Sequence, residues 1–267
     1  VGRVKNTIVI EEGAGFKADN YEITKNEGTL EITKNTDTIV ITADDGTWVY
    51  DGQAHSKNTY KVAGLMAGYS AEADITGSIT DAGAVENVVA SYVIKLGEED
   101  VTDQFGNVTT ENGTLTITKR FLEITAENAV KTYDGTPLTA EYSITAGSLA
   151  EGQTLDSVTV TGSQLFPGSS ANTASSAVIK DAEGNDVTGN YDITYVPGTL
   201  EVTKANIEIT ITASSASKVY DGKPLASRGW RLTSGTLATG DRLEVTVVGS
   251  ITEVGTAVNK IISVKVM

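Results

Sequence analysis

The tripeptide Tyr-Asp-Gly occurs three times, and its phenol and carboxylate groups are the first candidates for chemistry. The copies consist of Tyr50, Asp51 and Gly52, of Tyr133, Asp134 and Gly135, and of Tyr220, Asp221 and Gly222. A catalytic motif is usually needed once per active site, whereas a fold-specifying turn is needed once per domain. Asp-Gly favours turns because Asp hydrogen-bonds nearby backbone and Gly adopts positive φ without steric cost. We therefore predict a structural turn in each copy, with the three tyrosines mostly buried beside it.

The residue types that most other catalytic sites need are scarce. His55 is the only histidine and there is no cysteine, so this chain cannot build a thiolate nucleophile, a disulfide, a histidine cluster for zinc or a Ser-His-Asp triad. The 35 acidic residues could include the carboxylate pair that glycoside hydrolysis uses. No acid-rich motif is unique to one copy of the repeat, however. We therefore predict no enzyme activity and no cofactor.

One acidic segment superficially resembles a calcium loop. It is DAEGND, residues Asp181 to Asp186. An EF-hand loop needs Gly at its sixth position and Glu at its twelfth, where this chain has Asp186 and Asp192. A polar hairpin tip is therefore our interpretation, and calcium at acidic junctions between repeats stays as an alternative.

Two further patterns have both a structural and a functional interpretation. Trp48 and Trp230 each occur once, at different positions of the repeat. They could stack on a sugar ring as glycan contacts, or pack near the turn. Lys34, Lys119 and Lys204 recur at the repeat junctions, so a Lys–Asn isopeptide cross-link is a second alternative. His55 replaces a leucine of the other copies and is interpreted as a packing or surface substitution.

Composition limits the class of protein and its partners. The 267 residues are rich in β-branched side chains and glycine, which favours strands. The formal net charge is −15, and a chain this acidic repels nucleic acid and anionic membranes. No run of 18 apolar residues is present. We therefore expect an all-β protein with no nucleic-acid partner and no membrane insertion in this segment.

An internal repeat defines the domain organisation. Gly-Thr-Leu triplets begin at Gly28, Gly113 and Gly198, which gives a period of 85 residues. A unit of that length is an autonomous β-domain rather than a solenoid repeat. The predicted boundaries are as follows: residues 1–34 hold the C-terminal strands of a preceding repeat, 35–119 are repeat 1, 120–204 are repeat 2, and 205–267 are an incomplete repeat 3.

Period-two alternation of apolar and polar residues predicts sheets with one solvated face. It is clear in residues 190–194, 198–204, 206–213 and 242–250. About seven or eight short strands fit in one repeat, which predicts small β-sandwich-like modules, either immunoglobulin-like or β-grasp-like. The repeats join without a Pro- or Gly-rich spacer, so we expect an extended rod.

Three phrases of repeat 2 resemble a known family. YDGTPLT, GSLAEGQTLDSVTVTGS and GNDVTGNYDITYVPGTLEVTK are similar to the YDG/MBG-type tandem repeats of bacterial, Gram-positive-like cell-surface adhesins. The resemblance covers repeat 2, most of repeat 3 and the end of residues 1–34, and repeat 1 more loosely. It implies non-enzymatic stalk modules at an extracellular location, on the cell surface or in the cell wall. The alternative function is a module that binds host glycans or mucin.

The two partial repeats are complementary. Residues 1–34 contain closing strands of the kind that residues 205–267 lack. A lone hairpin is marginally stable in water, and an open sheet edge is a template for pairing. One hypothesis is that copies of the chain assemble end to end, with the N-terminal segment of one completing repeat 3 of the next to form a head-to-tail filament. The alternative is that both are pieces of a longer polypeptide.

Overall fold

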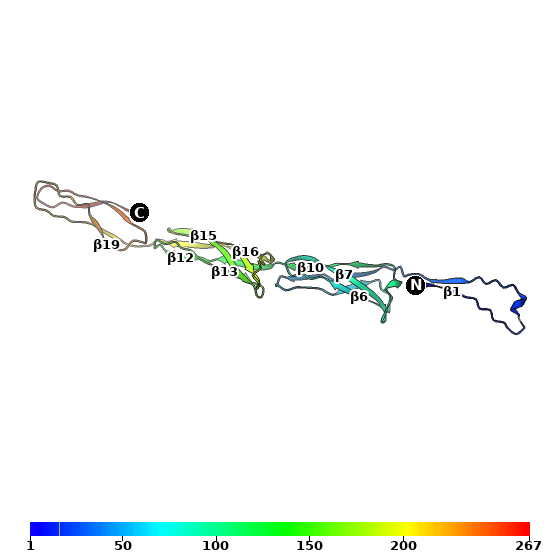
Figure 1. Cartoon of the computed structure of the whole chain (residues 1–267). Coiled ribbons are helices and arrows are strands. Elements are labelled where there is room, and N and C mark those ends of the chain that lie inside the picture. The colour runs from blue at the N-terminus through cyan, green and yellow to red at the C-terminus, as the bar shows by residue number, and fades with distance from the viewer. Residues whose placement is uncertain (16) are drawn as a thin grey trace. The chain divides into compact units, whose positions relative to one another are not determined.

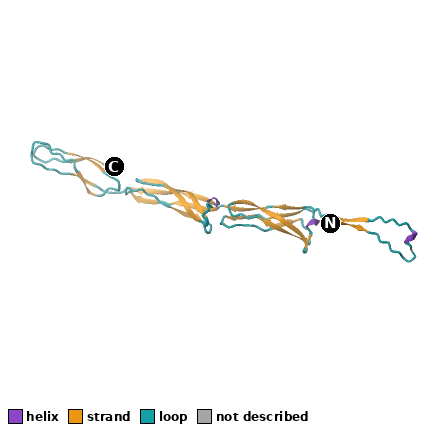
Figure 2. Cartoon of the chain, in the orientation of Figure 1, coloured by secondary structure: helices purple, strands orange, loops and turns teal. Residues whose placement is uncertain are grey.

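The computed structural model describes residues 1–15 and 17–267, and the described chain is all-β (Figures 1 and 2). Its helical segments are short 3₁₀ turns at Ala18–Asn20 (η1), Thr102–Gln104 (η2) and Thr188–Asn190 (η3). In these parts of the chain no helix has the length and apolar character needed to cross a membrane.

The chain divides into two compact units. The first contains Val1–Arg120 together with Gly189–Tyr191, and the second contains Phe121–Thr188 and Asp192–Met267. The first unit begins with a hairpin of strands β1 (Gly2–Asn6) and β2 (Gly28–Ile32), which pair antiparallel with each other. All residues of both strands are exposed.

Repeat 1 is a sandwich of two sheets. The first sheet has the order β4-β10-β7-β6, with β8 paired to β7, and the second has the order β5-β3-β9. The strands are β3 (Ile39–Ala43), β4 (Gly46–Val49), β5 (Tyr60–Ala63), β6 (Tyr69–Thr76), β7 (Gly83–Leu96), β8 (Glu99–Asp100), β9 (Val108–Glu111) and β10 (Gly113–Thr118).

The core of repeat 1 lies between these two sheets. Ile39, Ile41 and Ala43 of β3 pack with Ile75 of β6 and Ile94 of β7, and all five are buried. Alternate residues of each strand point inward, as the period-two pattern requires.

Repeat 2 has the same arrangement. Its sheets have the orders β12-β17-β15-β14 and β13-β11-β16. The strands are β11 (Arg120–Ala126), β12 (Ala129–Thr132), β13 (Tyr142–Gly147), β14 (Thr154–Thr161), β15 (Gly168–Lys180), β16 (Tyr191–Val196) and β17 (Gly198–Thr203). The prediction of a tandem all-β, sandwich-like chain is therefore confirmed.

Repeat 3 has fewer strands in the described residues. β18 (Thr210–Ala213) pairs only with β19 (Trp230–Ser234), and β20 (Leu243–Val248) pairs only with β21 (Lys260–Val266). The strand predicted at residues 206–213 begins only at Thr210, and Ile207 is exposed. The equivalent strands β3 and β11 each have a partner on both sides, whereas β18 has one, which explains why it is shorter.

Candidate functional site

The Tyr-Asp-Gly turns of repeats 2 and 3 are closed by the same charged contact. In repeat 2, Asp134 accepts the main-chain N–H of Thr136 at 2.8 Å, and Gly135 has φ 82°. The ammonium of Lys131 donates to Asp134 at 2.8 Å and also reaches the hydroxyl of Thr136 at 2.7 Å. Repeat 3 places Lys218 2.6 Å from Asp221.

These contacts stabilise the carboxylate form of the turn aspartates. The ammonium of Lys131, then the groups of Thr136, hold the pKa of Asp134 far below its ordinary value. Lys218 lowers the pKa of Asp221 in the same way. The lysine two residues before the tyrosine is thus part of the turn, a role that sequence reasoning missed.

Repeat 1 closes its turn differently. Trp48 occupies the position of Lys131 and Lys218, and its ring stacks on His55 with centroids 4.8 Å apart. His55 Nε2 lies 3.0 Å from Asp51 Oδ1. Asp51 also accepts the N–H of the second residue after it, which is the largest cause of its lowered pKa.

The two tryptophans for which glycan contact was the alternative to packing are both half-buried. One face of Trp48 is taken by His55, and its ring lies so close to Gly46 that a Cβ there would clash. Trp230 begins β19 and pairs with Ala213 of β18. They belong to different units of the chain.

The expectation that all three tyrosines are buried is wrong for Tyr220. Tyr50 is 2% exposed and Tyr133 is half-buried, but Tyr220 is 58% exposed. In repeats 1 and 2 the N–H of the tyrosine donates to the closing strand, to Thr118 and Thr203, each at 2.9 Å. No such strand lies beside Tyr220 among the described residues.

Each unit contains a contact that a turn or loop makes with the next repeat. In the second unit, Tyr133 Oη donates to Asp241 at 2.9 Å, and this hydrogen bond raises the pKa of Tyr133. The N–H of Thr239 donates to the carbonyl oxygen of Asp134 at 3.0 Å. A Cβ at Gly135 would clash with the backbone of Thr239.

The first unit includes Asn190 and Tyr191, which begin the segment predicted as a strand at residues 190–194. Asn190 accepts the N–H of Ala82 at 2.7 Å and donates to Asp81 at 2.9 Å, and Tyr191 packs edge-on against Tyr50 with ring centroids 5.7 Å apart. The amide of Asn190 is therefore engaged with these two residues. The isopeptide cross-link stays an untested alternative.

An asparagine with a buried side-chain oxygen recurs in all three repeats. Asn87 and Asn172 are 0% exposed. The Asn172 amide nitrogen donates to the carbonyls of Glu127, Ala140 and Glu141 at 3.0–3.4 Å, and the amide of Asn259 donates to Ser214 O at 2.8 Å. These side chains join separate loops and fix the approach of the sheets.

The signal for these asparagines was present in the sequence. Each lies ten residues after the glycine of a Thr-Gly-Ser or Val-Gly-Ser triplet, namely Gly77, Gly162 and Gly249. In a strand where apolar and polar residues alternate, a single asparagine is normally interpreted as a residue that faces solvent. The fixed spacing between the glycine and the asparagine was therefore missed.

The Gly-Thr-Leu strand occupies a central slot in repeats 1 and 2. β10 pairs parallel with β4 and antiparallel with β7, and β17 pairs in the same way with β12 and β15. The inward residues of these strands are 0–2% exposed; they are Leu115, Ile117, Leu200 and Val202. A Cβ at Gly113 or Gly198 would collide with the carbonyl oxygens of the last residue of β3 or β11 and of the residue that follows it.

The acidic segment at Asp181 is a loop in which the side chain of its first residue binds main-chain N–H groups of the same loop. Asp181 accepts the N–H groups of Glu183 and Asn185 at 3.1 and 2.8 Å, and its pKa is lowered first by the Asn185 side chain. The described parts of the chain contain no cluster of three or more His, Cys, Asp or Glu placed to hold a metal ion.

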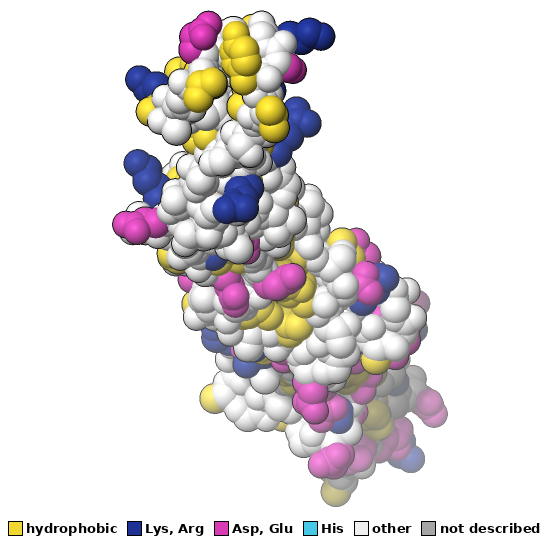
Figure 3. Space-filling view, turned by 90° about the vertical axis from the view of Figure 1, so that its left-hand side faces the viewer, with side chains coloured by type: hydrophobic (Ala, Val, Ile, Leu, Met, Phe, Trp, Pro, Cys, Tyr) yellow, Lys and Arg dark blue, Asp and Glu magenta, His cyan; other side chains and the backbone are white. Residues whose placement is uncertain are grey.

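On the face in view, Figure 3 shows acidic, basic and hydrophobic side chains interspersed.

Comparison with known proteins finds little. No family model matches the chain, and no curated protein matches it. Among solved structures, the I9–I11 tandem of titin is similar at 10% identity over 86% of this chain and 97% of that chain, with a TM-score of 0.26. A likeness of that size establishes neither a shared fold nor a shared function.

Proposed function

We propose that the chain is a series of non-enzymatic structural repeats that serve as a mechanical spacer in a bacterial surface or secreted adhesive protein. The extracellular location and the adhesin class follow from the resemblance of its Tyr-Asp-Gly and Gly-Thr-Leu phrases to tandem surface repeats. The mechanical role follows from how each complete repeat is closed.

The observation that carries the mechanical role is the parallel pairing of early and late strands. In repeat 1, β3 pairs parallel with β9 and β4 pairs parallel with β10; in repeat 2, β12 pairs parallel with β17. The chain enters each repeat near the first strand of such a pair and leaves it near the second. Tension on the two ends therefore pulls parallel neighbours in opposite directions along their axes.

In this geometry all the hydrogen bonds between the two parallel strands bear the force at the same time, as a shear load. They do not break one after another. A spacer under tension needs that property, whereas an enzyme or a binding module does not. Stretching the chain by its two ends tests the proposal. Repeats 1 and 2 should unfold in two separate high-force steps.

The alternative, a glycan-binding module, is weakened by the contacts of Trp48, one face of which is covered by His55. A glycan and mucin array probed with the full chain separates the two functions. The spacer predicts no saturable binding at millimolar sugar. Saturable binding that Trp48→Ala or Trp230→Ala abolishes would establish the binding module instead.

A further inference from the structure

The Tyr-Asp-Gly turn of repeat 2 fits a loop of repeat 3 through each of its residues. The hydroxyl of Tyr133 donates to the carboxylate of Asp241 at 2.9 Å, and the carbonyl oxygen of Asp134 accepts the N–H of Thr239 at 3.0 Å. Gly135 has φ 82°, and a Cβ there would clash with the carbonyl oxygen of Thr239. A side chain, a carbonyl group and a close backbone approach therefore all contribute to the junction of repeats 2 and 3.

The loop on the repeat 3 side recurs along the chain, but the residue that follows it changes. Residues 235–240 read GTLATG and precede Asp241, whereas residues 147–152 of repeat 2 read GSLAEG and precede Gln153. In repeat 1 the loop is shortened to GLMAG and precedes Tyr69. The position that accepts the tyrosine hydroxyl is thus a carboxylate in repeat 3 alone, and a carboxylate is the strongest acceptor for such a donor.

The first unit contains a second junction, built from other groups. Asn190 of repeat 2 accepts the N–H of Ala82 and donates to the carboxylate of Asp81, both of repeat 1. At the positions 85 residues further on, repeat 2 has Phe166 and Pro167. A phenylalanine side chain has no oxygen to accept an amide, and proline has no N–H to donate. The surface of repeat 1 therefore suits an asparagine of the next repeat, and the same surface of repeat 2 does not.

We propose that these contacts select which repeat can follow which, so that the order of the repeats is specified at their junctions. The turn of repeat 2 selects a loop that is followed by a carboxylate, Asp241. The surface of repeat 1 selects Asn190, which is 7% exposed. A wrong neighbour leaves such a polar group without its partner, and an unpaired buried group costs more than a matched pair gains. This inference goes beyond the proposed spacer function and does not depend on it.

The first test removes the hydroxyl–carboxylate contact in the full chain and follows hydrogen exchange of the Thr239 amide. Tyr133→Phe and Asp241→Ala should each speed this exchange by on the order of tenfold, and the double variant should be no faster, because both changes remove the same hydrogen bond. Glu253→Ala is the matched control, since it removes a carboxylate from an exposed loop of repeat 3. Unchanged exchange in the single variants, or effects that multiply in the double variant, overturns the proposal.

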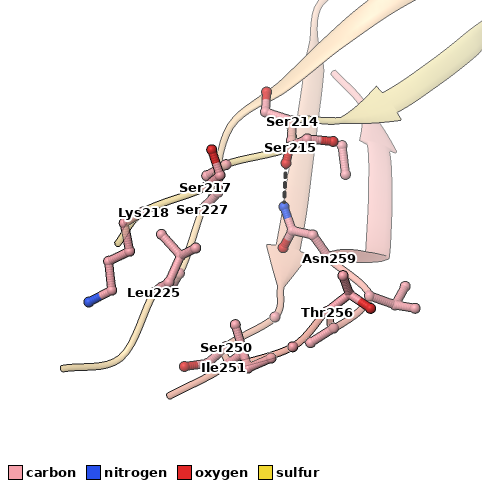
Figure 4. Close-up of a pocket in the computed structure, with 17 residues that line it drawn as sticks. Ser214, Ser215, Ser217, Lys218, Leu225, Ser227, Ser250, Ile251, Thr256 and Asn259 are labelled. Carbon is pink, nitrogen blue, oxygen red and sulfur yellow. Dashed lines mark hydrogen bonds between the residues drawn. The ribbon is translucent and has the colours of Figure 1, made fainter. Parts of the chain in front are cut away.

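Two internal reporters show whether the repeats themselves stay folded in these variants. The N–H of Leu138 donates to Gln164 O within repeat 2 at 2.8 Å. The side-chain amide of Asn259 donates to Ser214 O within repeat 3 at 2.8 Å (Figure 4). Exchange at both reporters should stay as in the wild type. Acceleration there by the same factor as at Thr239 would show that the variants unfold a repeat rather than open a junction, and it would contradict the proposal.

The second test makes one junction mismatched on purpose. Asp81→Phe combined with Ala82→Pro gives repeat 1 the residues of repeat 2, and exchange of the Asn190 side-chain amide should then rise by at least about tenfold. Exchange of the His55 amide, which is bonded within repeat 1, should not change. Thr80→Leu is the control, because it also introduces the repeat 2 residue at the neighbouring position. Equal Asn190 exchange in the wild type and both variants would show that repeat 1 does not select its neighbour.

Discussion

Asn172 fills the space that a side chain at Gly162 would need. A Cβ on Gly162 would lie 2.7 Å from Asn172 Oδ1 and 2.9 Å from the carbonyl oxygen of Ala171. Repeats 1 and 3 repeat the relationship between Gly77 and Asn87 and between Gly249 and Asn259. The glycine of each Thr-Gly-Ser or Val-Gly-Ser triplet is therefore explained by the side-chain amide of the asparagine ten residues later.

Gly162→Ala should destabilise repeat 2 by about 1–3 kcal/mol, because the backbone of β15 leaves no room for the methyl group. Gly189→Ala is the control, since nothing lies within 4 Å of a Cβ at that position. Denaturant unfolding of both variants measures the difference. Equal stability of the two would show that the contact with Asn172 is not tight.

Asn172→Asp should be more harmful at pH 7 than at pH 4. The amide donates to three main-chain carbonyls, and a carboxylate of the same shape would face them without a proton. Burial then raises its folded pKa above the unfolded value, so stability is retained at low pH and is lost as pH rises.

Thermal unfolding of Asn172→Asp across pH 3.5 to 7.5 measures this trend. Asn206→Ala, on the exposed surface, should change stability by no more than about 0.5 kcal/mol at any pH. A pH-independent loss in the Asp variant would contradict the assigned orientation of the Asn172 amide.

The Lys131–Asp134 contact should make the turn of repeat 2 sensitive to acid. The folded pKa of Asp134 lies below its unfolded value of about 3.9. Its stabilising contribution is therefore complete above that value and is lost as pH falls through the folded pKa.

Lys131→Met should bring the titration of Asp134, followed by NMR, back towards the ordinary range. Lys223→Met is the comparison, because that lysine belongs to the turn of repeat 3 and not to that of Asp134. An Asp134 titration that is the same in both variants would exclude the lysine as the main cause.

The turn of repeat 1 should tolerate conversion to the form seen in repeats 2 and 3. Trp48→Lys or His55→Leu alone breaks the Trp48–His55 stack and leaves the other residue without its stacking partner. The double variant has the lysine and leucine of repeats 2 and 3 together, so the two losses should be non-additive by about 0.5 kcal/mol or more. Strict additivity in denaturant unfolding would show that the two rings act independently.

Particular residues show how far the sequence could be interpreted. The period of 85 residues and the alternation at residues 190–204 predicted β16 and β17 closely, because one face of each strand packs against the core. β17 has a partner on both sides, whereas β16 is an edge strand that pairs with β11. The exposure of Tyr220 was not predicted, since burial of this tyrosine depends on a closing strand far along the chain. Lys131 was missed because Trp48 replaces it in repeat 1, which hides the pattern.

The candidate site was harder to predict than the fold. The Tyr-Asp-Gly turn has local chemistry that a tripeptide reveals, but the contacts that close it come from residues outside the tripeptide, such as Lys131 in repeat 2 and Trp48 in repeat 1. The recurring asparagines are polar residues in apolar surroundings, and only the three carbonyls around Asn172 explain their position.

The central claim is that each complete repeat is held shut by a Gly-Thr-Leu strand loaded in shear, and stretching single full-length molecules by their ends tests it. Wild-type chains should show two high-force steps, each releasing roughly 250–300 Å for a repeat of this length. Gly198→Val, which keeps β17 out of its slot, should abolish the step of repeat 2 and leave that of repeat 1. One cooperative step for the whole chain, or no loss in the variant, would contradict the account.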